Sequence, residues 1–218
     1  MLKEKLNAYQ AESLKRTNQD NQQIMQNAAQ ALIDQKIGAQ ALKKGDIMPS
    51  FNLINAKGQK VSSQELLSQG PVIINFYRGA WCPYCNLELR AYQALLPEIK
   101  QAKATLVAIS PELPDTSLSL VEKHQLDFEV LTDLDNELAK KMGLVFQLDK
   151  KLIEVYTKAG HDIAKAQGND RFELPLPATY VVNSDGKILL AYVNTDYRQR
   201  LEPSLALKAI LEVKKDES

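Results

Sequence analysis

Residues 71–85 read PVIINFYRGAWCPYC and contain the only two cysteines of the chain, Cys82 and Cys85. The apolar run Val72–Phe76 is typical of a strand that is buried on both faces of a sheet. From Tyr84 to Lys100 apolar residues recur at helical spacing, which predicts a helix immediately after the cysteines. We therefore expect the two thiols where a buried strand turns into a helix.

This position favours thiolate chemistry. The free N–H groups and the dipole at a helix N-terminus stabilise negative charge and lower the pKa of a thiol. Pro83 suits the first helical turn because its missing N–H would be unpaired there. A spacing of three residues brings two sulfurs close enough to bond. We expect Cys82 and Cys85 to form a redox-active dithiol covered by Trp81, rather than two inert buried thiols.

Composition excludes several classes of protein. The 218 residues are 44% hydrophobic and 25% charged, which fits one α/β domain with appendages. The formal net charge of +0 gives no electrostatic reason to expect a nucleic-acid partner or an anionic membrane surface. No apolar run approaches the roughly 20 residues of a membrane span, and the N-terminus lacks the apolar region of a secretory signal. We expect a soluble, cytoplasmic protein.

The two cysteines do not predict a metal site. A structural zinc ion takes four nitrogen or sulfur ligands, and the chain has only His124 and His161 besides the cysteines. His124 lies in a charged stretch that is typical of a solvated surface, and His161 lies in what reads as a helix junction. We expect no metal and no other cofactor.

The chain divides into an N-terminal helical extension, residues 1–44, a domain, residues 45–214, and a short tail, residues 215–218. The apolar residues of the extension that fall on one helical face are Ile24, Met25, Ala28, Leu32 and Ile33. We predict one helix that begins near Asp20 and stops at Gly45. Its apolar stripe is expected to pack on the domain or on a partner chain, so a homodimer is one alternative.

Within the domain, helical and strand patterns alternate. The predicted elements are a hairpin over 51–62, a helix over 63–67, strands over 72–76, 105–109 and 128–131, helices over 84–100, 115–124 and 136–142, a helix-prone stretch over 149–168, a second hairpin over 178–193 and a closing helix over 202–214. This order predicts an α/β sheet with helices on both faces.

Three segments resemble the peroxiredoxins, the alkyl hydroperoxide reductase/thiol-specific antioxidant family. Gly45–Leu53 (GDIMPSFNL) is similar to the family's G-D-x-x-P-x-F-x-L motif, Val107–Glu112 (VAISPE) to V-x-I-S-x-D, and Phe128–Asp133 (FEVLTD) to F-P-L-L-S-D. They occur in the family's order within residues 45–212. The resemblance implies a thioredoxin fold, a central mixed sheet flanked by helices, and antioxidant peroxidase chemistry.

The catalytic pattern of that family is matched only in part. Peroxiredoxins usually follow F-Y-P with x-x-x-T-x-x-C-x-x-E, which places Cys85 on the attacking cysteine and Glu88 on the glutamate. Arg78 stands in place of the proline, and Cys82 in place of the threonine. The family's supporting arginine falls at Pro177. The arginines that we consider as replacements are Arg78, Arg90 and Arg171.

The same departures resemble thioredoxin-like disulfide reductases, which carry C-x-x-C and a cis-proline before a strand. Leu174–Val182 (LPLPATYVV) is similar to that segment, so we predict a cis peptide bond at Pro177 as part of the catalytic site. The residues that we expect to bind substrate are Tyr77, Arg78, Trp81 and Tyr84.

Three functions remain open. In a thiol peroxidase one thiolate attacks the O–O bond, the other cysteine forms a disulfide with the resulting sulfenic acid, and a thioredoxin or glutaredoxin reduces the pair. Either Cys85 or Cys82 could attack first. In a protein disulfide oxidoreductase Cys82 attacks a substrate disulfide and Cys85 resolves the mixed disulfide. The third function is a non-enzymatic, redox-responsive binding protein. We favour the peroxiredoxin-like thiol oxidoreductase, which reduces hydrogen peroxide or organic hydroperoxides.

Overall fold

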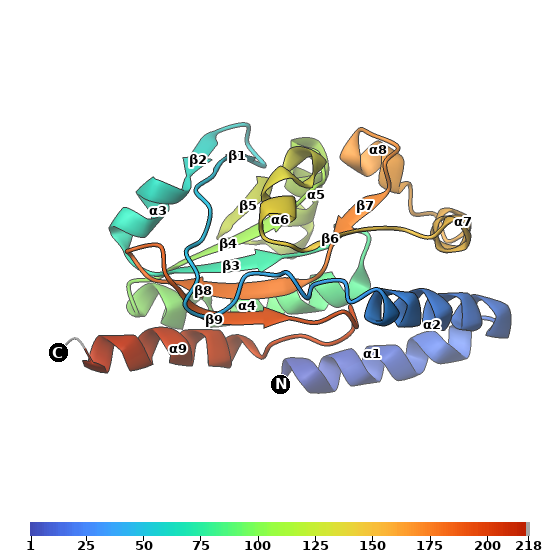
Figure 1. The fold of residues 1–218 in the computed structure, drawn as a ribbon, viewed down its shortest axis with the longest axis horizontal. Helices are drawn as coiled ribbons and strands as arrows, with labels where there is room; N and C mark the ends of the chain where they lie inside the picture. The colour runs from blue at the N-terminus through green and yellow to red at the C-terminus, as the bar shows by residue number, and fades with distance from the viewer. Residues whose placement is uncertain (217–218) are drawn as a thin grey trace.

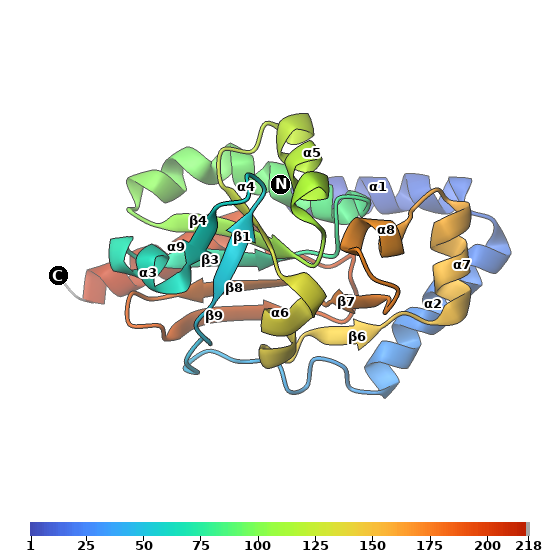
Figure 2. The same ribbon diagram turned by 90° about the horizontal axis from the view of Figure 1, so that it is seen from above.

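A seven-stranded mixed sheet forms the centre of the computed structural model, and helices cover both of its faces (Figure 1, Figure 2). The structure describes residues 1–216, and side chains among them as far as residue 213. Across the sheet the strands follow the order β2 (Lys60–Ser62), β1 (Asn52–Asn55), β5 (Glu129–Thr132), β4 (Thr105–Ser110), β3 (Val72–Phe76), β8 (Ala178–Val182) and β9 (Ile188–Val193). The predicted α/β class is confirmed.

Strand β3 lies between β4 and β8, and its sequence explains this central position. It pairs in parallel with β4 and antiparallel with β8, and all five of its residues are buried. Because successive side chains point to opposite faces, Ile73 packs in a cluster with residues of α4 (Pro83–Gln101) and α9 (Pro203–Asp216). Ile74 packs in another cluster, with residues of α3 (Ser63–Gln69). The prediction of a doubly buried strand is confirmed.

Along the chain between β4 and β8, short helices and a small ribbon accompany β5. These elements are α5 (Pro114–His124), the 3-10 helix η1 (Leu134–Asn136), α6 (Glu137–Lys141), β6 (Val145–Gln147), α7 (Lys150–Lys158), α8 (Ile163–Gln167) and β7 (Glu173–Pro175). The helix-prone stretch over 149–168 forms α7 and α8 because the Asp149 and Asp162 side chains cap them, accepting backbone N–H groups at 2.8 and 2.9 Å. The antiparallel ribbon β6–β7 was not predicted, because three-residue strands carry too little periodicity.

The N-terminal extension differs from its prediction. It forms two helices, α1 (Leu2–Arg16) and α2 (Gln19–Asp34), where one helix from Asp20 to Gly45 was expected. The true cap of α2 is Asn18, whose side chain accepts the backbone N–H of Asn21 at 2.8 Å. The helix ends at Asp34, well before the predicted stop at Gly45, because Lys36 after the cap residue Gln35 has a left-handed backbone at φ +52°, which does not continue a helix.

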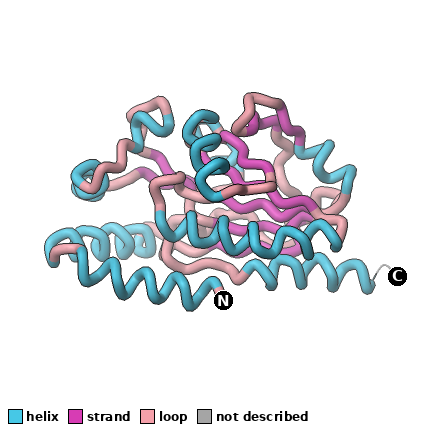
Figure 3. Tube along the Cα trace, turned by 180° about the vertical axis from the view of Figure 1, so that it is seen from behind, coloured by secondary structure: helices cyan, strands magenta, loops and turns pink. Residues whose placement is uncertain are grey.

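Both helices of the extension pack on the domain, α1 against α4 and α2 against α7. They lie at one end of the molecule (Figure 3) and diverge from the turn that joins them (Figure 2). Helix α1 packs against α4, burying Leu2 and Leu6, and its first backbone N–H groups donate to the carboxylate of Glu202 at 3.1 and 2.7 Å. Four residues of the predicted apolar stripe of α2 pack against the core: Ile24, Met25, Ala28 and Leu32. Ile33 stays half exposed, at 50%. The stripe thus packs on the chain's own domain.

Helix α9 runs to Asp216 and so enters the segment predicted as a tail. The last two residues of that tail, 217 and 218, lie outside the described residues. None of the helices between residues 1 and 216 combines the length and the apolar composition that crossing a membrane requires.

Candidate active site

The dithiol lies at the start of α4, directly after β3, as the sequence predicts. Cys82 is the N-cap residue, with an extended backbone at φ −87° and ψ 112°, and Pro83 opens the helix. Cys85 lies in the first turn. Both thiols are reduced and buried, with exposed fractions of 1% and 0%. The backbone N–H of Cys82 donates to the carbonyl of Gly79 at 3.1 Å, which fixes the loop between strand and helix.

Arg78 contacts the first thiol. Its Nη1 lies 3.9 Å from Sγ of Cys82, and its Nη2 donates to the hydroxyl of Tyr156 at 2.8 Å. The guanidinium carbon lies 4.7 Å from the ring centre of Trp81 and 4.4 Å from that of Tyr197. A cation held over aromatic faces is stabilised by their quadrupoles. Arg78 is 2% exposed and forms no ion pair with a carboxylate of the described residues. Its positive charge is therefore available to stabilise a thiolate at Cys82.

Arg200 contacts the second thiol. Its Nη2 lies 3.4 Å from Sγ of Cys85, and its Nε pairs with Oε2 of Glu88 at 2.6 Å. Both side chains of this ion pair are only 1% exposed. Glu88 was predicted to be catalytic, and the structure links it to Cys85 through Arg200. Sequence reasoning missed Arg200, because it stands 115 positions after Cys85 in a segment without a recognisable motif.

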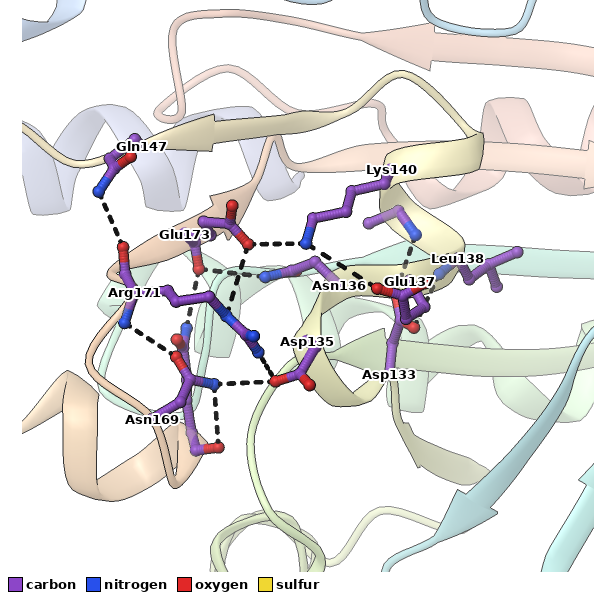
Figure 4. Close-up of polar contacts among 12 residues, drawn as sticks. Asp133, Asp135, Asn136, Glu137, Leu138, Lys140, Gln147, Asn169, Arg171 and Glu173 are labelled. Carbon is purple, nitrogen blue, oxygen red and sulfur yellow. Dashed lines mark hydrogen bonds and ion pairs between the residues drawn. The ribbon is translucent and has the colours of Figure 1, made fainter.

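Two of the three arginines considered as replacements lie elsewhere. Arg171 pairs with Asp135 and Glu173 in a partly exposed network near α6 (Figure 4). Its position follows from the acidic residues of η1 and β7, which attract its charge. Arg90 is exposed and donates to a backbone carbonyl one turn earlier in α4. Arg78 is thus the one of the three that contacts a thiol.

The two thiols differ in their electrostatic surroundings. Burial alone would raise the pKa of Cys82, but the hydrogen bond with Cys85 and the charges of Arg78 and Arg200 outweigh burial and lower this pKa. Burial raises the pKa of Cys85, and the hydrogen bond to Cys82 raises it further. The directions of these shifts favour the thiolate form at Cys82 and the protonated thiol at Cys85.

Two buried carboxyl groups support the site. Oε2 of Glu112 accepts the backbone N–H of Ala80 at 2.8 Å, and burial raises the pKa of Glu112 to about 8. Burial also raises the pKa of Glu88 to about 7, although Arg200 lowers it. Gly79 allows this close packing, because at its φ of +151° a Cβ would overlap Oε1 of Glu112. Glu112 belongs to the VAISPE segment, but its contact with the cysteine loop was not predicted.

The prediction of a cis peptide bond at Pro177 is wrong. No peptide bond of the described residues is cis, so the Leu176–Pro177 bond is trans. Strand β8 begins at the next residue, Ala178, which pairs with Phe76 of β3. A trans proline continues the extended backbone into β8, and its missing N–H is tolerated at a strand entry. Pro177 is buried there as an ordinary strand-entry proline.

The predicted substrate-binding aromatics take different positions. Tyr77 is fully buried at 0% exposure, in the cluster that also contains both cysteines. The Tyr84 ring makes edge contacts with Tyr197 at 5.5 Å and with Tyr9 of α1 at 5.1 Å. Trp81 is half-buried, and its ring centre lies 5.6 Å from that of His161. Sequence reasoning did not assign three further residues to this site, because no motif marks them: Tyr156, His161 and Tyr197.

Comparison with known proteins places these residues in a family. Residues 44–191 match the model of the AhpC/TSA family. The chain is 30% identical to Peroxiredoxin Bcp of Escherichia coli (strain K12) over 103 residues, which cover 47% of this chain and 65% of that protein. It thus spans just under two thirds of this relative's length.

Two further comparisons extend the match. Thiol-disulfide oxidoreductase ResA of Bacillus thuringiensis subsp. konkukian is 22% identical over 162 residues, which cover 74% of this chain and 76% of that protein. The crystal structure of Peroxidoxin BcpB from Mycobacterium tuberculosis superposes with a TM-score of 0.63 at 23% identity, covering 79% of this chain and 98% of that one. This structural likeness shows the thioredoxin fold of peroxiredoxins. The chain belongs to the AhpC/TSA family.

Proposed function

We propose that the chain is a thiol-dependent peroxidase in which Cys82 attacks the peroxide and Cys85 resolves the product. The observation that carries this proposal is that Arg78, which pairs with no carboxylate of the described residues, lies 3.9 Å from Sγ of Cys82, whereas the arginine beside Cys85, Arg200, is paired with Glu88. The directions of the two pKa shifts, lowered at Cys82 and raised at Cys85, agree with this. The family pattern alone would place the attack on Cys85. The charges around the two sulfurs favour the reverse assignment.

In the first step the Cys82 thiolate attacks one oxygen of a hydroperoxide, ROOH. The S–O bond forms as the O–O bond breaks, and the departing RO⁻ takes up a proton and leaves as an alcohol or water. The sulfur is oxidised by two electrons to a sulfenic acid, and the peroxide is reduced. Nη1 of Arg78, 3.9 Å from the sulfur, stabilises the charge that develops on the departing oxygen.

In the second step the Cys85 thiol attacks the sulfur of the Cys82 sulfenic acid. The S–S bond forms as the S–O bond breaks, and the hydroxyl group leaves with the thiol proton as water. The spacing of the two cysteines within one helical turn suits this reaction. A thioredoxin- or glutaredoxin-type dithiol then returns two electrons and two protons by disulfide exchange. A cytoplasmic location, where such reductants occur, is part of the proposal.

Disulfide exchange with a protein substrate is the second candidate function, favoured by the C-x-x-C spacing and by the similarity to ResA over 74% of the chain. Cys82 and Cys85 are 1% and 0% exposed, so a small peroxide reaches them with less opening of the structure than a folded protein needs. The same opening is required for re-reduction by a thioredoxin-type protein. The trans bond at Pro177 also removes the cis-proline on which the comparison with disulfide reductases rested.

Stopped-flow fluorescence of Trp81 tests the proposal, because Trp81 is the single tryptophan and adjoins Cys82. The reduced protein should respond to hydrogen peroxide or cumene hydroperoxide with a second-order change much faster than a free thiol. Cys82→Ser should abolish this change. Cys85→Ser should keep it and leave a sulfenic acid that dimedone traps. A rate no better than a free thiol's would refute the peroxidase, and loss in Cys85→Ser alone would reverse the two roles.

A further inference from the structure

A cavity of about 210 Å³ lies between α2 of the N-terminal extension and the segment from β6 to α7. Ala28 and Leu32 of α2 form part of one wall, and Leu152 of α7 forms part of the other. Arg78 and Tyr156 also line it. Half of the lining residues are aliphatic, and the rest comprise the aromatic rings of Phe146, Tyr156 and Tyr197 and the polar side chains of Gln35, Gln147, Asp149 and Arg78. The cavity therefore offers an apolar wall on α2 and a cation and hydroxyl groups near the dithiol.

Arg78 connects this cavity to the thiolate. The same guanidinium that lines the cavity places its Nη1 3.9 Å from Sγ of Cys82. Its Nε is buried and has no hydrogen-bond partner among the described residues. A buried, charged donor without an acceptor is unfavourable unless a ligand or water supplies one. A ligand oxygen bound beside Arg78 would supply such an acceptor.

We propose that this cavity binds the organic part of a hydroperoxide substrate, with its oxygens at Arg78, and that α2 determines which organic groups are accepted. This inference rests on the peroxidase function proposed above. An apolar protein cavity of about 150 Å³ is large enough to bind benzene. A cavity of about 210 Å³ therefore accommodates an aromatic or branched aliphatic group. Helix α2 lies outside the segment that matches the family, residues 44–191, so this selectivity belongs to the extension of this chain.

Filling the cavity tests the proposal. The variant Ala28→Leu places three more carbon atoms in the wall formed by α2. We measure second-order rate constants of the reduced protein with cumene hydroperoxide and with hydrogen peroxide, which has no organic part. The ratio of the two constants should fall at least tenfold. Ala11→Leu is the matched control, because Ala11 is exposed on α1, and there the ratio should not change.

A binding measurement separates the cavity from the chemistry. The unreactive alcohol 2-phenyl-2-propanol should bind the reduced protein, followed by Trp81 fluorescence, and Ala28→Leu should weaken this binding at least tenfold. Such binding without reduction of either peroxide would support the site and refute the peroxidase.

Three results would overturn the site. They are an unchanged ratio of rate constants in Ala28→Leu, an equal loss with both peroxides, and alcohol binding that Ala28→Leu leaves intact. If Ala28→Leu does not fold, Leu32→Ala enlarges the cavity instead. The rate constant for cumene hydroperoxide should then rise at least threefold relative to that for the smaller tert-butyl hydroperoxide, and an unchanged ratio would equally refute the site.

Discussion

The turn from β3 to α4, which carries the dithiol, and the pair of helices α1 and α2 are held in place very differently. At the turn, Arg78, Glu88 and both cysteines are at most 2% exposed and are fixed by hydrogen bonds and ion pairs. In the helical pair, Leu2 and Leu6 are the buried residues of α1, and α2 has none that is fully buried. The turn lies within the family match, and the pair lies before it.

This difference distinguishes the buried turn, which carries the dithiol, from the less buried helices that lie beside it. A segment with few buried apolar contacts opens at a lower free energy than the core that it covers. We therefore expect the domain to supply the reacting groups and the helical pair to influence what reaches them. The predictions below act first on the turn and then on the helical pair, in order of decreasing expected effect.

The largest effect is expected at the buried ion pair of Arg200 and Glu88. The variant Arg200→Met leaves Glu88 buried without its partner, and breaking a buried ion pair in this way costs about 3–5 kcal/mol of stability. Urea unfolding at pH 8 measures this loss, because Glu88, whose pKa is about 7, is ionised there in the wild type.

Arg171→Met provides the control for that measurement. Its network in Figure 4 is partly exposed, with 44% of the Arg171 side chain accessible. Exposed ion pairs contribute about 0–1 kcal/mol, so the control should unfold almost as the wild type does. Equal losses in the two variants would show that Arg200 is no more important to the fold than a surface arginine.

A smaller effect is expected at Arg78. The variant Arg78→Gln removes a charge that lowers the pKa of Cys82, so this pKa should rise. Each unit by which the pKa then exceeds the working pH lowers the thiolate fraction about tenfold. Because this pKa starts at about 5, the peroxide rate should fall most clearly at mildly acidic pH, by about tenfold for each unit by which the raised pKa exceeds the working pH, and should recover as the pH is raised. Thiolate absorbance at 240 nm, followed against pH, reports the pKa directly.

Arg90→Gln is the matched control for Arg78→Gln. Arg90 is exposed on α4 and contacts no thiol. Its removal should leave the midpoint of the thiolate titration where it is in the wild type. If the two variants share that midpoint, Arg78 does not stabilise the thiolate, and the assignment of Cys82 as the attacking residue loses its main electrostatic support.

The two regions also differ in how well the sequence predicts them. The strand β3, the helix after it and the position of the dithiol follow from local patterns, namely a continuous apolar run, helical periodicity and Pro83. Helix α1 was not predicted, because its sequence is largely polar and offers little apolar periodicity. The predicted start of α2 near Asp20 lies two residues after the true cap, Asn18.

The supporting groups of the site were predicted less well, because they arrive from distant parts of the chain. Arg200 contacts Cys85 although the two residues are 115 positions apart in the sequence. Tyr156 and Arg78, which also contact each other, are 78 positions apart. No local pattern encodes such contacts, since they depend on how the loops after β9 and β6 fold back. The trans bond at Pro177 was missed for a similar reason. The pairing of β8 with β3, which begins at Ala178, involves a distant strand and cannot be predicted from the proline alone.

The smallest effect is expected at the contact between α1 and the domain. The variant Tyr9→Leu keeps an apolar side chain but removes the edge contact with Tyr84, and such aromatic pairs contribute about 0.5–1.5 kcal/mol. Opening of α1 should become about 2- to 10-fold more frequent, as measured by hydrogen exchange of its amides. Reduction of the Cys82–Cys85 disulfide by thioredoxin should accelerate in parallel, because the reductant needs the dithiol uncovered. Leu14→Ala, at a position on α1 that is 44% exposed, should change neither rate. Faster exchange without faster reduction would mean that α1 does not control access, and that the reductant reaches the dithiol from another side of the turn.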